Sequence, residues 1–177
     1  MAAGSRTQKQ DEKWVFDPAI MFSCVVTKQH PQAYIPISDI LTKEHCRGKH
    51  PFIQEKALYL EAVETEMATG KRSKAPIVDF SIGLARGKNP IIRLVEAKFD
   101  VDDLKNLKSS NIPDKVRHSR DVLQNCGIKI EGGAVVLINK SKIVQQQRRW
   151  LEQILLAKGH YQVRTVDEFY KLYFDYK

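Results

Sequence analysis

The most constraining feature of this sequence is a pair of apolar segments joined by a short polar link. Residues 75–84 and 91–99 are rich in isoleucine, valine and phenylalanine, which are residue types enriched in β-strands. The link at residues 86–89 (RGKN) has the glycine and the polar residues of a tight turn. The pattern predicts an antiparallel β-hairpin with Gly87 and Lys88 at the two central turn positions.

Helices and further strands are predicted on both sides of the hairpin. A proline near the start and a glycine at the end delimit a helix over residues 52–69, because a first helical turn tolerates proline and glycine ends helices. An interrupted helical pattern over residues 102–125 precedes a continuous apolar segment at 133–139, which is typical of a strand covered on both faces. The remaining predictions are a buried strand or helix start at 19–26, a short helix from Ser38 to His45, a helix over 141–158 capped by Ser141, a strand at 161–164, and a helix to 174 with a Thr165–Glu168 capping box.

This order of elements predicts an α/β fold in which the hairpin joins a partly parallel, mixed sheet flanked by helices. We expect residues 1–13 to be a flexible N-terminal segment and residues 14–177 to form a single domain. No apolar run reaches the ~20 residues that span a bilayer, and the N-terminus lacks the apolar part of a secretory signal. The three cysteines are too few and too scattered for a disulfide scaffold, so a cytoplasmic protein is expected.

The charge balance is strongly basic. Lysine and arginine number 29 against 21 acidic residues, which gives a net charge of +8 and a pI near 9.4. A positive field attracts polyanions, so nucleic acid is the expected class of partner and a membrane is not. A basic protein without a nucleic-acid partner would have the same composition, so the charge balance alone does not identify the partner.

The charged residues Asp79, Glu96 and Lys98 lie within the two otherwise apolar strands of the hairpin. Strand alternation places Glu96 and Lys98 on one face of the sheet and Ala97 on the other. With the turn centred as described above, the numbers of paired residues sum to 175, so Asp79 lies opposite Glu96. Opposed residues hold their Cβ atoms ~4.5–5.5 Å apart, and like charges at that separation repel.

A divalent cation between these carboxylates would turn the repulsion into attraction, and hard oxygen ligands suit Mg²⁺ or Mn²⁺. Other readings stay open. The register could slip by two residues, Glu96 and Lys98 could form an ion pair at a sheet edge, or Asp79 could begin a strand near solvent. A zinc site at Cys46, His45 and His50 is not expected, because no second pair of ligands accompanies them.

Asp79, followed after 16 residues by Glu96-Ala97-Lys98, resembles the signature of the PD-(D/E)xK nuclease superfamily, which has the restriction-endonuclease-like fold. The predicted order of helix, hairpin, strand, helix and strand between residues 52 and 164 resembles the core of that fold and covers about two-thirds of the chain. The chain departs from the signature at Val78, where proline is often found.

The resemblance implies metal-dependent hydrolysis of phosphodiester bonds. Asp79 and Glu96 would ligate Mg²⁺ or Mn²⁺ together with the backbone carbonyl of Ala97, and Lys98 would position or activate the attacking water. Glu64 would be the helix-borne acid that such enzymes often use, as an added ligand or through water. It falls in the middle of the apolar stripe of the helix predicted over residues 52–69.

The helix predicted over residues 141–158 carries candidate nucleic-acid contacts. At 100° per residue its inner face is defined by Ile143, Trp150, Ile154 and Ala157, with Gln147 among them. Gln146 and Trp150 have the spacing of a Gln-x-x-x-aromatic pattern that some branches of the superfamily contain. The outer face would offer Lys142, Arg148 and Arg149 to phosphates. The alternative is a solvated glutamine surface with a tryptophan in the core.

The sequence, with this resemblance, therefore predicts a magnesium-dependent endonuclease that acts on nucleic acid in restriction, repair, recombination or mobile-element processing. The resemblance alone implies DNA rather than RNA. A homodimer would let two sites address both strands. The main alternative is a non-catalytic nucleic-acid-binding or interaction protein built on a nuclease-like core. A third reading is a small basic scaffold protein with ion pairs in its hairpin.

Overall fold

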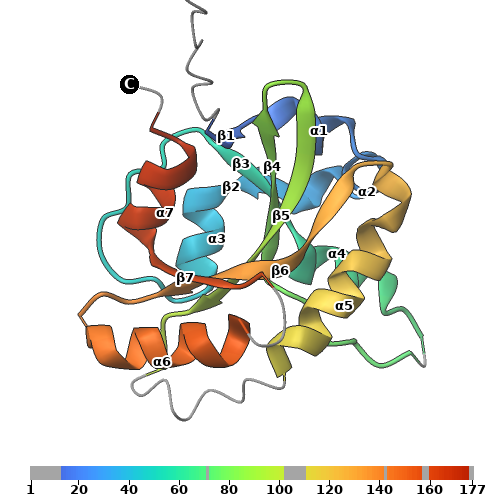
Figure 1. The fold of residues 1–177 in the computed structure, drawn as a ribbon. Helices are drawn as coiled ribbons and strands as arrows, with labels where there is room; N and C mark the ends of the chain where they lie inside the picture. The colour runs from blue at the N-terminus through green and yellow to red at the C-terminus, as the bar shows by residue number, and fades with distance from the viewer. Residues whose placement is uncertain (1–12, 71, 102–110, 142, 157–159, 176–177) are drawn as a thin grey trace, which may run out of the picture.

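The computed structural model describes residues 13–70, 72–101, 111–141, 143–156 and 160–175. Their strands form one seven-stranded sheet in the order β2-β3-β4-β5-β6-β7, with β1 paired to β4 outside this path (Figure 1). The strands are β1 (Val15–Phe16), β2 (Tyr34–Pro36), β3 (Lys56–Tyr59), β4 (Phe80–Arg86), β5 (Asn89–Lys98), β6 (Lys129–Ile138) and β7 (Gln162–Thr165). The α-helices are α1 (Pro18–Ser23), α2 (Val25–Gln29), α3 (Ile37–Lys43), α4 (Leu60–Met67), α5 (Asn111–Leu123), α6 (Gln145–Leu156) and α7 (Val166–Tyr173). The expected α/β fold with a mixed sheet flanked by helices is confirmed.

The predicted hairpin is formed by β4 and β5, and its register is the predicted one. Arg86 pairs with Asn89 across the turn, and the ladder continues to Phe80 opposite Val95. Gly87 has a φ of 57°, a left-handed conformation that costs glycine little and explains why this residue begins the turn. The register therefore brings Asp79, one residue before β4, next to Glu96.

The second half of the sheet is parallel, because β5 pairs with β6 and β6 pairs with β7 in that sense. The apolar segment predicted at 133–139 forms the buried part of β6, which starts earlier, at Lys129. Strand β6 lies between two other strands and under helices on both faces, which accounts for its continuous apolar pattern.

The helix predicted over residues 52–69 is wrong in its first half. Residues 56–59 form strand β3, which pairs with β2 on one side and β4 on the other, and only Leu60–Met67 is helical. Ile53, which the helical stripe assigned to the buried face, is 88% exposed. Pairing with two neighbouring strands satisfies the backbone of residues 56–59 and overrides their helix propensity, which is a weak preference.

The sheet separates two apolar cores. One face is covered by α1, α2, α4, α5 and α6, and the other by α3 and α7. In Figure 1, α3 and α7 stand together at the left of the sheet, and α2, α4 and α5 lie at the right. Helix α1 lies especially close to the hairpin, since a Cβ atom on Gly83 would come within 2.5 Å of the Ile20 Cβ. The apolar run at 19–26 is thus helical, which its pattern alone had left open.

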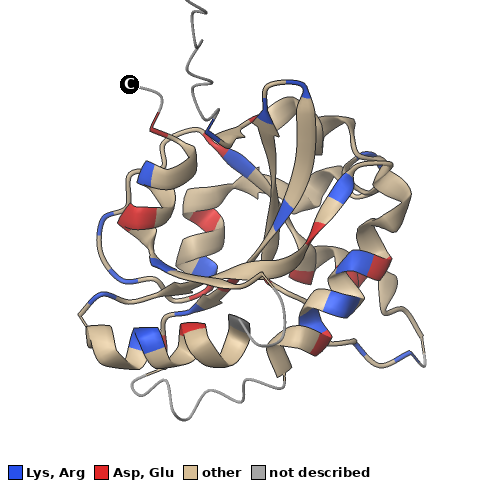
Figure 2. Ribbon diagram, in the orientation of Figure 1, with Lys and Arg blue, Asp and Glu red and all other residues tan. Residues whose placement is uncertain are grey.

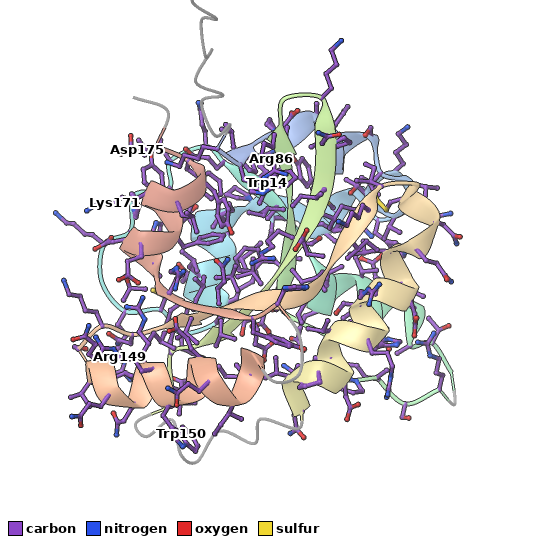
Figure 3. The ribbon with its side chains drawn as sticks, in the orientation of Figure 1. Trp14, Arg86, Arg149, Trp150, Lys171 and Asp175 are labelled. Carbon is purple, nitrogen blue, oxygen red and sulfur yellow. A yellow bond between two sulfur atoms is a disulfide. The ribbon has the colours of Figure 1, made fainter. Side chains whose placement is uncertain are left out.

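The last two helices differ in how well the sequence predicted them. Helix α7 begins with the predicted capping box between Thr165 and Glu168. Helix α6 starts at Gln145, so the predicted cap at Ser141 is wrong, and that side chain instead bonds Asn139. The predicted inner face is also wrong at Trp150, which is 39% exposed and points away from the sheet (Figure 3), whereas Leu151 and Leu155 are buried.

A disulfide joins Cys24, between α1 and α2, to Cys126, just after α5. The two cysteines are 102 residues apart and give no local signal of pairing. Cys46 is a free, half-buried thiol. Within the part of the chain that the structure describes, no helix combines the length and apolar character needed to cross a membrane.

Candidate active site

Asp79 and Glu96 form the centre of the candidate site. Asp79 is 5% exposed and Glu96 is fully buried. The Asp79 Oδ2 atom accepts a hydrogen bond of 2.5 Å from the backbone N–H of Ala97, which ties the aspartate to the strand that carries Glu96. Burial, together with the negative charges of Glu96 and Glu44, raises the pKa of Asp79 to about 8. The strands therefore hold two carboxyl groups close together where water is scarce.

Two ammonium groups contact Glu96. Lys98, from the same strand, forms an ion pair with Glu96 Oε1, and Lys115 Nζ of α5 lies 2.7 Å from the same oxygen. Burial alone would lower the pKa of Lys115, but the charge and hydrogen bond of Glu96, together with the charges of Asp79 and Glu61, outweigh burial and raise it. The other carboxylate oxygen, Glu96 Oε2, is buried and accepts no hydrogen bond from any described residue. A buried carboxylate oxygen without a donor is uncommon and calls for an explanation.

Further acidic residues adjoin this centre. Glu44, which follows α3, accepts a hydrogen bond of 2.8 Å from the Tyr59 hydroxyl. Burial and the charges of Glu61 and Glu96 raise the pKa of Glu44, although the Tyr59 hydrogen bond lowers it. Glu61, in the first turn of α4, lies 3.0 Å from Lys74.

Sequence reasoning missed Glu44, Glu61 and Lys115 as neighbours of the hairpin. Only the position of Glu61 at the edge of the apolar stripe of its helix could have indicated it. Glu44 and Lys115 reach the site from helices whose packing the sequence does not display.

Glu64 lies in a neighbouring cluster. It is fully buried and receives Arg72 at 3.1 Å, His118 Nε2 at 3.0 Å and the backbone N–H of Ala75 at 2.8 Å. Burial alone would raise the pKa of Glu64, but the contacts with His118 and Ala75 outweigh it and lower the pKa. Its oxygens thus contact α5 and the segment before β4, whereas the contacts seen in the described residues do not join it to Asp79 or Glu96.

The segment between α4 and β4 connects the two clusters. Arg72 and Ala75 of this segment contact Glu64, and Lys74 contacts Glu61. Further along, the backbone N–H of Val78 donates to the Ser119 hydroxyl of α5 at 3.0 Å. These contacts fasten the segment to α4 and to α5, so that Asp79 enters the sheet at a fixed position.

The side chains predicted to contact nucleic acid from α6 and the segment before it differ in exposure and in bonding. Gln146 and Arg149 are exposed, and Lys142 lies outside the described residues. Gln147 accepts a hydrogen bond of 3.3 Å from the backbone N–H of Val144. Arg148 forms ion pairs with Glu168 at 2.9 Å and Glu152 at 3.8 Å, so binding a phosphate would require it to leave two acids.

The arrangement suits the chemistry of a hard cation. Carboxylate and carbonyl oxygens are the ligands that Mg²⁺ prefers, and this ion often takes only one or two carboxylates from the protein and keeps several waters. Within the described residues, no three His, Cys, Asp or Glu side chains are placed so as to hold a metal ion. The fold instead provides a pair of acidic candidate ligands, Asp79 and Glu96.

Comparison with known proteins gives no relative. No family model, no curated protein and no solved structure matches this chain. Its function has to be inferred from its own residues.

Proposed function

We propose that this protein is a metal-dependent nuclease that hydrolyses phosphodiester bonds in nucleic acid, with DNA as the preferred substrate. The observation that carries the proposal is the meeting of buried Asp79 and Glu96 on adjacent strand positions, with the Lys98 ammonium group on Glu96. Burying two carboxyl groups side by side costs stability, and such pairs cluster at binding and catalytic sites, which supports the proposal. The order of these residues in the chain is that of the PD-(D/E)xK signature.

Asp79, Glu96 and the backbone carbonyl of Ala97 would hold Mg²⁺ or Mn²⁺. The buried Glu96 Oε2 has no donor among the described residues, and a cation would satisfy it. A bound divalent ion would polarise the phosphate and lower the pKa of a water molecule. In this assignment the hydrogen bond from Ala97 fixes the orientation of the Asp79 carboxylate.

The lysines supply positive charge beside these acids. Lys98 would orient the attacking water and offset negative charge that develops on the phosphate. Lys115 contacts the same carboxylate oxygen from α5, so a second ammonium group is close by. Lys115 therefore joins Lys98 as a candidate for stabilising the anionic transition state.

A non-catalytic nucleic-acid-binding protein is the second candidate. It is favoured by the pairing of Glu96 with two ammonium groups, which neutralises that carboxylate without any metal. In this reading the hairpin charges stabilise the fold, and the basic surface alone binds nucleic acid.

Metal binding and DNA cleavage distinguish the candidates. The wild-type protein is expected to bind Mn²⁺ in calorimetry and to nick plasmid DNA with Mg²⁺ or Mn²⁺. Asp79→Asn and Glu96→Gln should lose both properties, and Lys98→Ala should bind metal but lose at least about 100-fold in cleavage rate. Asp175→Asn, an exposed acid beyond α7, is the matched control and should behave as wild type.

Three outcomes contradict the proposal. Metal binding without cleavage of any nucleic acid would favour the non-catalytic alternative. Cleavage that survives in both carboxylate variants would show a contaminating nuclease or a site elsewhere. Failure to bind any divalent ion would remove the metal site altogether.

A further inference from the structure

A small basic pocket lies at the ends of the parallel strands, at the end of β5 that carries Glu96 and Lys98. Its volume is about 100 Å³. The residues that matter for its chemistry are Cys46, Arg47 and Lys49 from the loop after α3, Lys140 from the segment after β6, and Asp167 from the first turn of α7. We call it the Arg47 pocket.

The Arg47 pocket and the candidate active site share one end of the sheet and two chain segments. Phe99, which lines the pocket, directly follows Lys98, and Ile138, also in its lining, is the β6 partner of Lys98. On the other side, Arg47 lies three residues after Glu44, whose charge contributes to the raised pKa of Asp79. Phe99 belongs to the core beneath α3 and α7, so the pocket lies on that face, at the end of the sheet where Asp79 and Glu96 meet. A polymer that crosses this end of the sheet would pass both sites.

The charge of the pocket favours an anion. Arg47, Lys49 and Lys140 are exposed, and within the described residues none of the three forms an ion pair. Basic positions on the loops after α3 and after β6 lie at the same end of the sheet in Figure 2. One acid, Asp167, opposes them. Three cations from two chain segments facing one hollow raise the local concentration of anions.

The size and chemistry of the pocket narrow the ligand to one compact anionic group. Pockets for drug-sized ligands or cofactors measure ~300–1,000 Å³, several times the volume found here. Thiolate chemistry does not suit the site, because burial and the charge of Asp167 raise the pKa of the Cys46 thiol. A phosphate group matches both the size and the charge, and arginine is suited to bind phosphate with two parallel hydrogen bonds.

We propose that the Arg47 pocket binds a backbone phosphate of the nucleic-acid strand that is cut at Asp79 and Glu96. This inference rests on the proposed function and adds to it the contact that fixes the register of the strand beside the reacting bond. Arg47 and Lys140 contact the phosphate from two different chain segments, and the negative charge of Asp167 lowers the affinity for it. A phosphate contact of this kind positions the substrate without reading its sequence.

Binding of a short fluorescein-labelled DNA duplex, followed by anisotropy in EDTA, tests the contact without cleavage. Arg47→Gln and Lys140→Gln should each weaken binding about two- to fivefold and lower the slope of log affinity against log salt by about 0.9. Asp167→Asn should instead tighten binding. Lys88→Gln removes an exposed cation at the hairpin turn, about 30 Å away along the ten residues of β5, and should change neither quantity.

Two further measurements separate this role from a general charge effect. In cleavage assays Arg47→Gln should raise KM and leave kcat unchanged, because the pocket binds substrate and transition state equally. Bound duplex should also slow the alkylation of Cys46, which lines the pocket. Melting curves of each variant confirm that it is folded.

The outcomes distinguish this inference from the proposed function. If the wild-type protein cleaves DNA but the Arg47→Gln and Lys140→Gln variants bind like Lys88→Gln, the pocket assignment is overturned and the nuclease proposal stands. If the Arg47→Gln and Lys140→Gln variants bind more weakly as expected but the wild-type protein cleaves no DNA, the phosphate contact stands and the nuclease proposal is overturned. If the wild-type protein does not bind DNA at all, both proposals fail.

Discussion

Single residues of the candidate site have different roles according to the partners that the fold gives them. Asp79 and Glu64 are both buried acids, yet the pKa of Asp79 is raised to about 8 while that of Glu64 is lowered. Burial raises the pKa of both acids, and the charges of Glu96 and Glu44 raise that of Asp79 further, whereas contacts with His118, Ala75 and Arg72 lower that of Glu64. Glu64 has three donors around it, and Asp79 has one backbone N–H and faces two further carboxylates. A poorly neutralised acid is the better candidate for binding a cation.

The first prediction concerns Glu64. Glu64→Gln removes a buried charge that pairs with Arg72 and contacts His118, and we expect it to lower the free energy of unfolding by about 3 kcal/mol. Metal affinity measured by calorimetry should stay as in wild type, in contrast to Asp79→Asn. A variant of unchanged stability that no longer binds metal would instead assign Glu64 as a ligand, the role that the family resemblance implies.

Among the elements, α7 shows a close agreement between local sequence and structure. Thr165 and Glu168 cap its first turn reciprocally, and Glu168 also lies 2.9 Å from Arg148 of α6. Burial would raise the pKa of Glu168, but the Thr165 N–H and the Arg148 charge outweigh it and lower the pKa below the ordinary value of 4.5. This helix is thereby joined to α6 through a charge that acid removes.

The second prediction follows from that lowered pKa. A lowered pKa stabilises the folded state above the ordinary value, and this contribution disappears as the pH falls through the lowered value. Glu168→Gln keeps the capping hydrogen bonds but not the charge, so it should cost about 0.5–1 kcal/mol at pH 7, a modest figure because the side chain is 41% exposed. Urea unfolding at several pH values should show the difference shrinking as the pH falls below the ordinary value of 4.5 and through the lowered one.

A double-mutant cycle provides the control for this experiment. Arg148→Gln should show the same pH dependence as Glu168→Gln, and the two changes together should cost less than their sum. Equal costs at pH 3 and pH 7 would contradict the assigned role of the charge.

At the scale of the whole molecule, the disulfide joins parts of the chain that are far apart in sequence. Cys24 lies beside α1 and α2, which cover the hairpin, and Cys126 follows α5, which carries Lys115 and His118. A cross-link over 102 residues restricts the unfolded chain strongly and holds α5 in its place over the sheet.

The third prediction is therefore that reduction lowers stability. Loss of the bond in Cys126→Ala, or in dithiothreitol, should lower the free energy of unfolding by about 2–4 kcal/mol in urea titrations. Thiol titration of the unfolded, non-reduced protein should detect only Cys46, and reduction should expose all three cysteines. If non-reduced protein isolated from its natural source has three reactive thiols, the disulfide does not form there. That result would agree with the cytoplasmic location expected from the sequence.

The local sequence by itself determined the hairpin, its register and the capping box of α7, because turn residues, strand alternation and caps act over a few neighbouring residues. It therefore predicted that Asp79 would meet Glu96, and the register confirms this. Only the tertiary structure decided that residues 56–59 are a strand, that Trp150 faces outward and that Cys24 meets Cys126. It also decided which charges surround the two acids, since Glu44 and Lys115 reach them from helices on opposite faces of the sheet. Such contacts depend on how distant elements pack, and no local pattern records them.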